Sequence, residues 1–245
     1  MPVEDTTDRS GKSQAACEAK ERLIEAGVDL FGKYGFDGVS TRSLADAAKV
    51  NLAAIQYHFG GKEGLYLAVA RHIVDSVGSW SYPVISRIDG SLAETDPDPA
   101  TRFGLVCELL DGIIENVLGS PESKRWMGIF IREQIEPSEA FDILFEGVMS
   151  PLHRCLCSLM GPILDLETDD PETKLQAFTI MGPVFIFRFS QAEIDRAMNW
   201  PAYGPEELHR IRRIVLEHVR VVLGFPRETL EAYFKTKPTL HGTSA

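Results

Sequence analysis

The chain has 245 residues, of which 44% are hydrophobic and 25% charged, and its formal net charge is −11. These values are ordinary for a globular protein and argue against a disordered, collagen-like or disulfide-scaffold chain. The longest apolar run, residues 180–187, is too short for a membrane-spanning helix and contains Gly182 and Pro183. The polar N-terminus lacks the apolar core of a signal peptide, so we expect a cytoplasmic protein whose four cysteines are reduced.

The charge is spread unevenly along the chain. Residues 1–62 hold 8 basic and 9 acidic residues, so most of the negative charge lies further on. Between residues 38 and 62 basic residues outnumber acidic ones, with Arg42, Lys49 and Lys62 against Asp46. Phosphate binding depends on the local field and not on the overall charge. The sequence therefore permits one DNA-facing end on an acidic body.

The N-terminal region predicts an arm followed by a helix. Residues 1–13 read as a disordered arm, and residues 15–34 carry apolar positions at helical spacing. Gly35 follows as the stop signal, because glycine accepts the left-handed conformation at the end of a helix. The apolar stripe that we expect to face inward is Leu23, Ala26, Leu30 and Tyr34.

Two short helices are predicted next. Ser40 is a candidate N-cap for a helix that begins at Thr41, and a bend at Lys49 and Val50 follows. Asn51 can cap the third helix, which ends before two glycines, and a long fourth helix begins at Lys62. The residues expected to face inward are Leu44, Ala47, Ala48, Leu52, Ile55, Phe59, Leu65, Val69, Ile73 and Val77. Two capped helices joined by a short turn fit the helix-turn-helix pattern.

The rest of the chain predicts further helices and no strand of convincing length. Pro83 and residues 89–99 are predicted to form a turn-rich linker, because proline and glycine punctuate helices. The later helices are expected at residues 102–118, 122–134, 138–160, 171–191 (interrupted at Gly182 and Pro183) and 205–223. We therefore expect an all-α chain of about nine or ten helices.

The third predicted helix presents a face suited to reading DNA. Ala53, Ala54, Tyr57 and His58 lie opposite its apolar side, and Gln56 flanks them. Small side chains let the backbone approach base edges, and glutamine can pair with adenine. We predict that phosphates are held by Thr41, Tyr57 and Lys62, and that bases are faced by Arg42, Ala53 and Gln56, with His58 beside them.

These motifs resemble the DNA-binding domain of TetR-type transcriptional regulators. The resemblance rests on the Tyr57-His58-Phe59 triplet, on Lys62-Glu63 and on Thr41-Arg42, and it covers residues 15–70. Lys49 stands where the family turn usually has glycine. A non-glycine residue can adopt the left-handed conformation of such a turn at a cost of about 1 kcal/mol. Gln56 stands where many members carry a second aromatic residue, so the phosphate contact of that aromatic residue is not expected here.

The remainder resembles a narrower subgroup, the CecR/CerR-type regulators with a DUF1956 C-terminal domain. The segments that carry this resemblance are residues 130–134, with Pro137 following, and residues 148–153. The resemblance implies a homodimer that binds palindromic double-stranded operator DNA and a small-molecule effector. We predict a division into a disordered arm (1–13), a helix-turn-helix DNA-binding domain (14–62), an effector-binding and dimerisation domain (63–225) and a C-terminal tail (226–245).

Polar groups in an apolar pocket give such effector sites their specificity. The candidate effector residues combine aromatic and basic side chains: Trp126, Phe130, Arg132, Phe178, Met181, Phe185 and Arg188. A ligand among them could tilt the fourth helix and release a repressor from DNA. Residues 172–190 and the last long helix are apolar over more than one stripe, so we predict that both pair with their two-fold mates.

Other functions find less support in the sequence. His153, Cys155 and Cys157 invite a metal or redox interpretation, but no second cluster completes a tetrahedral set. Buried cysteine is commonly a small hydrophobe, so we expect no metal and no cofactor. The sequence lacks the nucleophile-elbow, Walker A, dinucleotide-binding and zinc-protease motifs. We therefore predict that the protein is not an enzyme. The alternative is a helical small-molecule-binding or catalytic protein whose N-terminal bundle is only structural.

Overall fold

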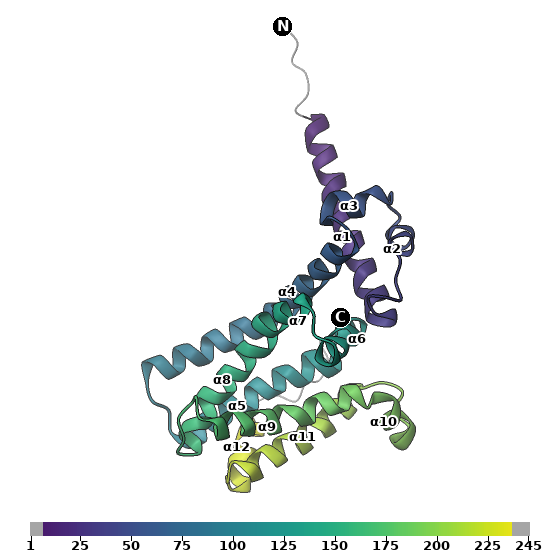
Figure 1. Ribbon diagram of the computed structural model, residues 1–245. Coiled ribbons are helices and arrows are strands. Elements are labelled where there is room, and N and C mark those ends of the chain that lie inside the picture. Colours follow the sequence, from purple (N-terminus) through teal and green to yellow (C-terminus); the bar gives the residue numbers. More distant parts are fainter. Residues whose placement is uncertain (1–6, 237–245) are drawn as a thin grey trace. The chain divides into compact units, whose positions relative to one another are not determined.

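The computed structural model describes residues 7–236 and confirms an all-α chain, with no strand in that range (Figure 1). The sequence expectation of nine or ten helices is close, and the structure divides some stretches more finely. The helices are α1 (Thr7–Tyr34), α2 (Thr41–Ala48), α3 (Ala53–Phe59), α4 (Lys62–Glu94), α5 (Pro99–Ile113), α6 (Pro121–Ile135), α7 (Glu139–Leu144), α8 (Ser150–Ile163), α9 (Pro171–Phe189), α10 (Gln191–Met198), α11 (Pro205–Val222) and α12 (Arg227–Thr236). Two π-helical segments, η1 (Ile114–Gly119) and η2 (Phe145–Met149), follow α5 and α7.

The described chain forms two compact units. The first holds the chain up to Ser76 together with Lys124–Gly147, and the second holds Val77–Ser123 and the chain from Val148 onward. The predicted boundary near residue 62 differs from this division, because α6 and α7 pack with the N-terminal helices. At the ends, α1 takes in the last residues of the predicted arm, and α12 lies within the predicted tail.

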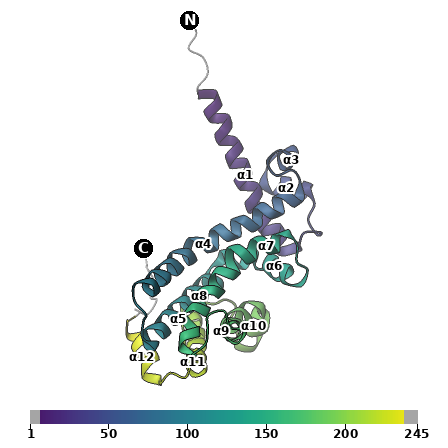
Figure 2. The same ribbon diagram turned by 60° about the vertical axis from the view of Figure 1, so that its left-hand side comes forward.

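The core of the first unit is built on α1. Figure 2 shows α2 and α3 beside α1, whose N-terminal turns extend past them. Leu23 and Phe31 are completely buried, whereas Tyr34 is 52% exposed, so the prediction that Tyr34 faces inward is wrong. In this part of α1 the aromatic ring that faces inward is that of Phe31, which packs edge-on against Tyr66 with ring centroids 5.0 Å apart.

The predicted linker is much shorter than expected, because α4 continues through Pro83 to Glu94. Proline usually breaks a helix by removing one hydrogen bond and crowding the preceding turn. Here Pro83 is exposed, while Val77 and Ile88 on either side of it are buried in the second unit. The burial of these flanking turns holds the helix together, and Asp98 then caps α5 by accepting from the amides of Ala100 and Thr101.

Helix α9 likewise runs unbroken through Gly182 and Pro183, so the predicted interruption is wrong. Its buried residues on the two sides of Pro183, Ile180 and Val184, lie in the core. The helix packs on α8, α11 and η1, and Figure 1 shows α9 and α11 running side by side. Tertiary packing therefore overrides the local signal at both prolines.

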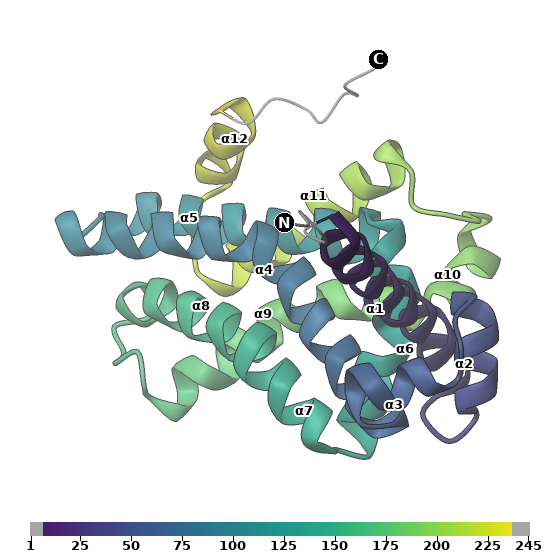
Figure 3. The ribbon, with the colours of Figure 1, turned by 90° about the horizontal axis from the view of Figure 1, so that it is seen from above.

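The second unit also includes α12, which lies against α5 and α11 (Figure 3). The place where these three helices meet is polar at its centre. Arg212 of α11 donates from Nε to Asp111 Oδ1 of α5 at 2.6 Å. Tyr233 of α12 donates its hydroxyl to the other oxygen of the same carboxylate. Asp111, Arg212 and Tyr233 are all buried, so this triad fixes α12 to the body of the unit.

Candidate DNA-reading site and effector region

The helix-turn-helix is closed by caps that its sequence predicts. The Ser40 hydroxyl accepts from the Ser43 amide at 3.0 Å, and the Ser43 hydroxyl accepts from the Ser40 amide at 3.1 Å. Lys49 is left-handed, with φ 54°, so the turn forms without the usual glycine. Arg22 of α1 donates to the last carbonyl of α2, that of Ala48, at 3.2 Å. These contacts fix α2 and the turn against α1.

Helix α3 presents the predicted outward face. The Ala53 amide donates to Asn51 Oδ1 at 2.9 Å, and Ile55 is buried beneath the helix. On the opposite side Tyr57 is 82% exposed, and its ring meets His58 edge-on. Of the other candidates, Arg42, Ala53 and Gln56 are exposed and Thr41 and His58 are half-buried. Leu52, expected inside, is 48% exposed, because it occupies the N-cap position ahead of the helix.

Lys62 has an internal role that its sequence position does not reveal. Its Nζ donates to the carbonyls of Phe36 at 3.0 Å and Val39 at 3.1 Å, and it lies 4.0 Å from the centroid of the Phe36 ring. An ammonium has three N–H donors, so one remains for another acceptor. Lys62 therefore joins the turn before α2 to the start of α4.

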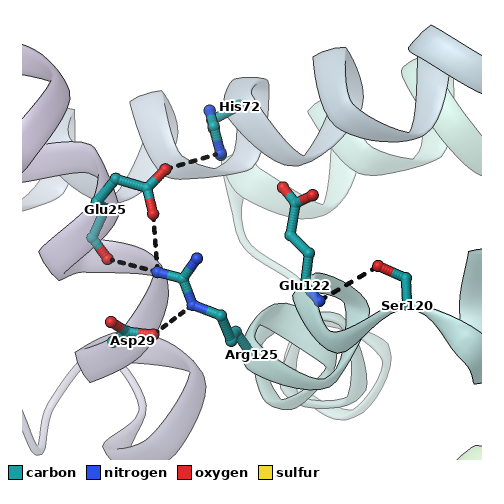
Figure 4. A network of polar contacts seen from close by, with 6 residues as sticks. All are labelled: Glu25, Asp29, His72, Ser120, Glu122 and Arg125. Carbon is teal, nitrogen blue, oxygen red and sulfur yellow. Dashed lines mark hydrogen bonds and ion pairs between the residues drawn. The ribbon is translucent and has the colours of Figure 1, made fainter. Parts of the chain in front are cut away.

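Helix α6 is bound to α1 by ion pairs, as Figure 4 shows. Arg125 donates to Asp29 at 2.6 Å and to the Glu25 carboxylate at 2.8 Å. His72 of α4 lies 3.6 Å from the same glutamate. The hydrogen bond to Asp29 raises the pKa of Arg125, and the Glu25 bond adds to it. Sequence reasoning missed this contact, since the partners are about a hundred residues apart.

A second buried contact joins α4, α6 and the start of α7. Tyr66 donates its hydroxyl to Glu133 at 2.7 Å, and the other oxygen of this carboxylate accepts from the amide and hydroxyl of Ser138. Burial and the Glu133 bond both raise the pKa of Tyr66. Because Glu133 is buried and accepts three hydrogen bonds, it positions α6 relative to the helix that leaves the DNA-reading motif.

The two arginines predicted to bind an effector both donate to carbonyls at helix ends. Arg132 donates to Phe31, Gly32 and Lys33 in the last turn of α1. Arg188 donates to Val117 at 2.9 Å and to Leu118 at 2.9 Å, in the last turn of η1. A cation is favourable there, because the last carbonyls of a helix carry partial negative charge. Both guanidiniums are therefore engaged within their own unit.

The other predicted effector residues fall in both units and differ in exposure. Trp126 and Phe130 belong to the first unit, and both are buried. In the second unit Met181 is buried and Phe185 half-buried, while Phe178 is 61% exposed with its ring against His153. The indole Nε1 of Trp126 is buried without a hydrogen-bond acceptor among the described residues. A buried donor of this kind is costly unless another group accepts from it.

The cysteine-histidine cluster is a packing element of α8. The Cys157 sulfur lies 3.7 Å from His153 Nδ1, and His153 Nε2 lies 3.1 Å from the Lys174 carbonyl. All four cysteines carry free thiols, and burial raises the pKa of Cys155 to about 12. A raised pKa disfavours the thiolate that redox chemistry and metal binding require. Within residues 7–236 no three metal-ligating side chains are grouped, and no helix is long and apolar enough to cross a membrane.

The capped helix-turn-helix in an all-helical chain defines the class: a DNA-binding transcriptional regulator. Residues 23–69 match the family described as bacterial regulatory proteins of the TetR family. Residues 107–224 match the C-terminal domain of the HTH-type transcriptional dual regulator CecR. The chain belongs to the TetR family of transcriptional regulators and is of the CecR type.

Individual relatives agree with this assignment. The dual regulator CecR of Shigella flexneri is 31% identical over 206 residues, which are 84% of this chain and 92% of that protein. RutR of Escherichia coli strain K12 is 37% identical over 67 residues, 27% of this chain and 32% of that protein. The structure of AibR with isovaleryl coenzyme A and operator DNA matches with a TM-score of 0.57 at 16% identity, over 81% of this chain and 96% of that one. A regulator from Rhodococcus sp. Rha1 matches with a TM-score of 0.55 at 20% identity, over 83% and 96%.

Proposed function

We propose that this regulator is a homodimeric cytoplasmic repressor that binds a palindromic operator and is released by a small molecule. The proposal has the protein acting through binding and not through catalysis. The observation that carries it is the exposed face of α3, where Gln56 and Tyr57 project from a helix fixed by Ile55. A helix held in this way suits the major groove, where base edges carry a distinct hydrogen-bonding pattern.

In this proposal the candidate contact residues divide into two groups. Thr41, Tyr57 and Lys62 hold phosphates. Arg42, Ala53 and Gln56 face the bases, with His58 beside them. Phosphate contacts position the protein on DNA, whereas contacts to base edges determine which sequence is bound.

The experiment is a salt-titrated binding assay on the DNA upstream of the protein's own gene. Saturable binding whose affinity falls steeply with salt is expected, because phosphate contacts release counterions. Gln56→Ala should change the ranking of operator variants, and Tyr57→Phe should weaken all of them alike. Equal, weak binding to every promoter fragment would favour the alternative in which the N-terminal bundle is only structural.

Lys62→Ala tests the phosphate role of an ammonium that also braces a turn. If the third N–H binds phosphate, the variant should weaken all sequences alike and reduce the salt slope by about one. If Lys62 only holds the carbonyls of Phe36 and Val39, the variant should lose thermal stability at an unchanged salt slope. An unchanged slope would remove Lys62 from the proposed contacts, and Glu63→Ala, on an exposed neighbour, is the matched control.

The homodimer rests on the outer faces of α9 and α11. Four large apolar side chains of α9 are about half or more exposed: Leu175, Phe178, Ile186 and Phe189. On α11 the corresponding residues are Val221 and Val222. Contiguous exposed apolar surface usually marks an interaction site. We infer that these faces meet their two-fold mates as a four-helix bundle.

The effector part of the proposal rests on Trp126. Its buried indole N–H lacks an acceptor among the described residues, so a ligand with an acceptor atom beside Phe130 would satisfy it. We propose that such a ligand biases the protein against operator binding, with a coupling of about 1–3 kcal/mol. Linkage then requires that bound operator weaken effector affinity by the same factor. Calorimetry with and without operator DNA tests this, and equal affinities would mean that the ligand is not an inducer.

A further inference from the structure

A groove of about 800 Å³ runs between α11 and α12 in the second unit. Cations line it from both helices, with Arg210 and Arg213 on α11 and Lys235 on α12. Its apolar lining comes from Ile214, Leu230 and Phe234. Volumes of this size are typical of small-molecule sites.

The far wall of this groove is fixed in place. Helix α12 is held by the buried triad of Asp111, Arg212 and Tyr233, and the Arg212 guanidinium also lies 5.4 Å from the centroid of the Phe234 ring. Because Asp111 neutralises Arg212, that arginine is not available to a ligand. The match to the family C-terminal domain ends at residue 224, so α12 lies outside the matched region.

Among the described residues, three of the other cations that line the groove make no ion pair, while Arg227 lies 3.9 Å from the Glu217 carboxylate. These three are Arg210, Arg213 and Lys235, whereas Glu217 is paired with Arg220 at 2.8 Å. Glu231 is the other carboxylate that lines the groove. The groove is thus locally positive on a chain of net charge −11. Unpaired guanidiniums beside apolar side chains are complementary to an anion that also carries an apolar part.

We propose that the groove between α11 and α12 binds a small amphiphilic anion. Its carboxylate or phosphate is held by Arg210 and Arg213, and its apolar chain or ring lies on Leu230 and Phe234. A guanidinium fork matches either oxyanion in bidentate geometry, and the apolar lining favours an anion that also carries an apolar part. This site is separate from the effector region around Trp126 and does not depend on DNA binding.

The test is isothermal titration calorimetry on the full chain without DNA. The probes are octanoate and hexyl phosphate, which differ in the oxyanion, and 1-octanol, which lacks the charge. At least one anion should bind once per protomer, and 1-octanol should bind about tenfold more weakly or worse, because it makes no charge-assisted hydrogen bond. Stronger binding of octanoate or of hexyl phosphate identifies the preferred head group.

The test variant and its control both replace exposed arginines with glutamine. Combining Arg210→Gln with Arg213→Gln should weaken the anion about tenfold or more, while Arg196→Gln on α10 should leave it unchanged. Circular dichroism confirms that the variants fold. Three results would overturn the proposal: no heat with either anion, equal affinity in the double variant, or binding that disappears as protomers associate. The last result would show that a second copy of the chain covers the groove.

Discussion

Single charged side chains close helix ends and join helices throughout this protein. Arg132 and Arg188 cap carbonyls of α1 and η1, while Glu133 and Asp111 each accept from two other helices or segments. A buried polar group that keeps its partners costs little, whereas one that loses them is strongly destabilising. Stability should therefore be most sensitive at these residues.

Asp111→Ala should lower the free energy of unfolding by about 3–5 kcal/mol, because it leaves the buried Arg212 charge unpaired. Urea denaturation followed by circular dichroism measures this loss. The double variant Asp111→Leu with Arg212→Leu should lose less, since it buries no isolated charge. A single variant as stable as the original chain would contradict the role assigned to the triad.

The stability of the protein should fall at alkaline pH through Tyr66. Burial and Glu133 raise its pKa in the folded state above the ordinary value of 10.0, so its contribution is complete below that pH. Above pH 10.0 the Tyr66 hydroxyl loses its proton in the unfolded chain but keeps it in the folded chain. The free energy of unfolding therefore falls by about 1.4 kcal/mol per pH unit.

Urea denaturation between neutral pH and pH 11 measures this slope. Tyr66→Phe should make it shallower, and the same change at Tyr57, which is 82% exposed, should not. A slope that Tyr66→Phe leaves unaltered would show that the hydroxyl does not titrate with folding.

At the scale of elements, the crossing of α1 and α6 depends on two glycines. A Cβ added at Gly128 would lie 2.0 Å from the Gly32 carbonyl oxygen, and one added at Gly32 would lie 1.9 Å from the Arg125 carbonyl oxygen. Both neighbours are backbone atoms, which cannot move aside without separating the helices. Glycine at these positions lets Arg125 and Arg132 reach α1.

Gly128→Ala should therefore destabilise the first unit by about 1–3 kcal/mol through overpacking. Gly104→Ala is the matched control, because nothing lies within 4 Å of its added Cβ in α5. That control should stabilise the protein by roughly 0.5–1 kcal/mol, as alanine favours a helix over glycine. Thermal melts of the two variants should shift in opposite directions, and shifts in the same direction would contradict the close crossing.

Local sequence signals predicted the DNA-reading elements well. Ser40 caps α2, Lys49 adopts the left-handed turn and Ile55 is buried, because these features depend on residues a few positions apart. Pro83 and Pro183 misled the prediction, since packing on distant helices decides whether a proline ends a helix.

The candidate effector residues show the same limit at the site. An arginine in an aromatic neighbourhood reads as a ligand contact, but Arg132 and Arg188 cap helix ends that are about 100 and 70 residues earlier in the chain, respectively. Such long-range hydrogen bonds leave no periodic signal in the sequence. Of the aromatic residues in that set, Trp126 and Phe130 are buried, whereas Phe178 is 61% exposed.

At the scale of the whole molecule, assembly should depend on the exposed faces of α9 and α11. Ile186→Glu places a charge on a side chain that is 51% exposed, and burying an unpaired carboxylate in an interface is costly. The variant should sediment as a monomer at micromolar concentration and bind a palindromic operator far more weakly. Ile135→Glu, at a 74% exposed position of α6, should remain dimeric. A monomeric unmodified chain, or a dimeric Ile186→Glu variant, would remove this interface.

The attachment of α6 to α1 has a consequence for how the chain is made. The first unit is discontinuous, because its last part, Lys124–Gly147, is synthesised after the first half of the second unit. Glu25, Asp29 and Tyr66 must wait for Arg125 and Glu133 to leave the ribosome before their contacts close. Contacts of such high sequence separation slow folding, since loop closure comes before they form. A fragment ending at Ser76 would carry every predicted DNA contact yet lack the helix that completes its fold.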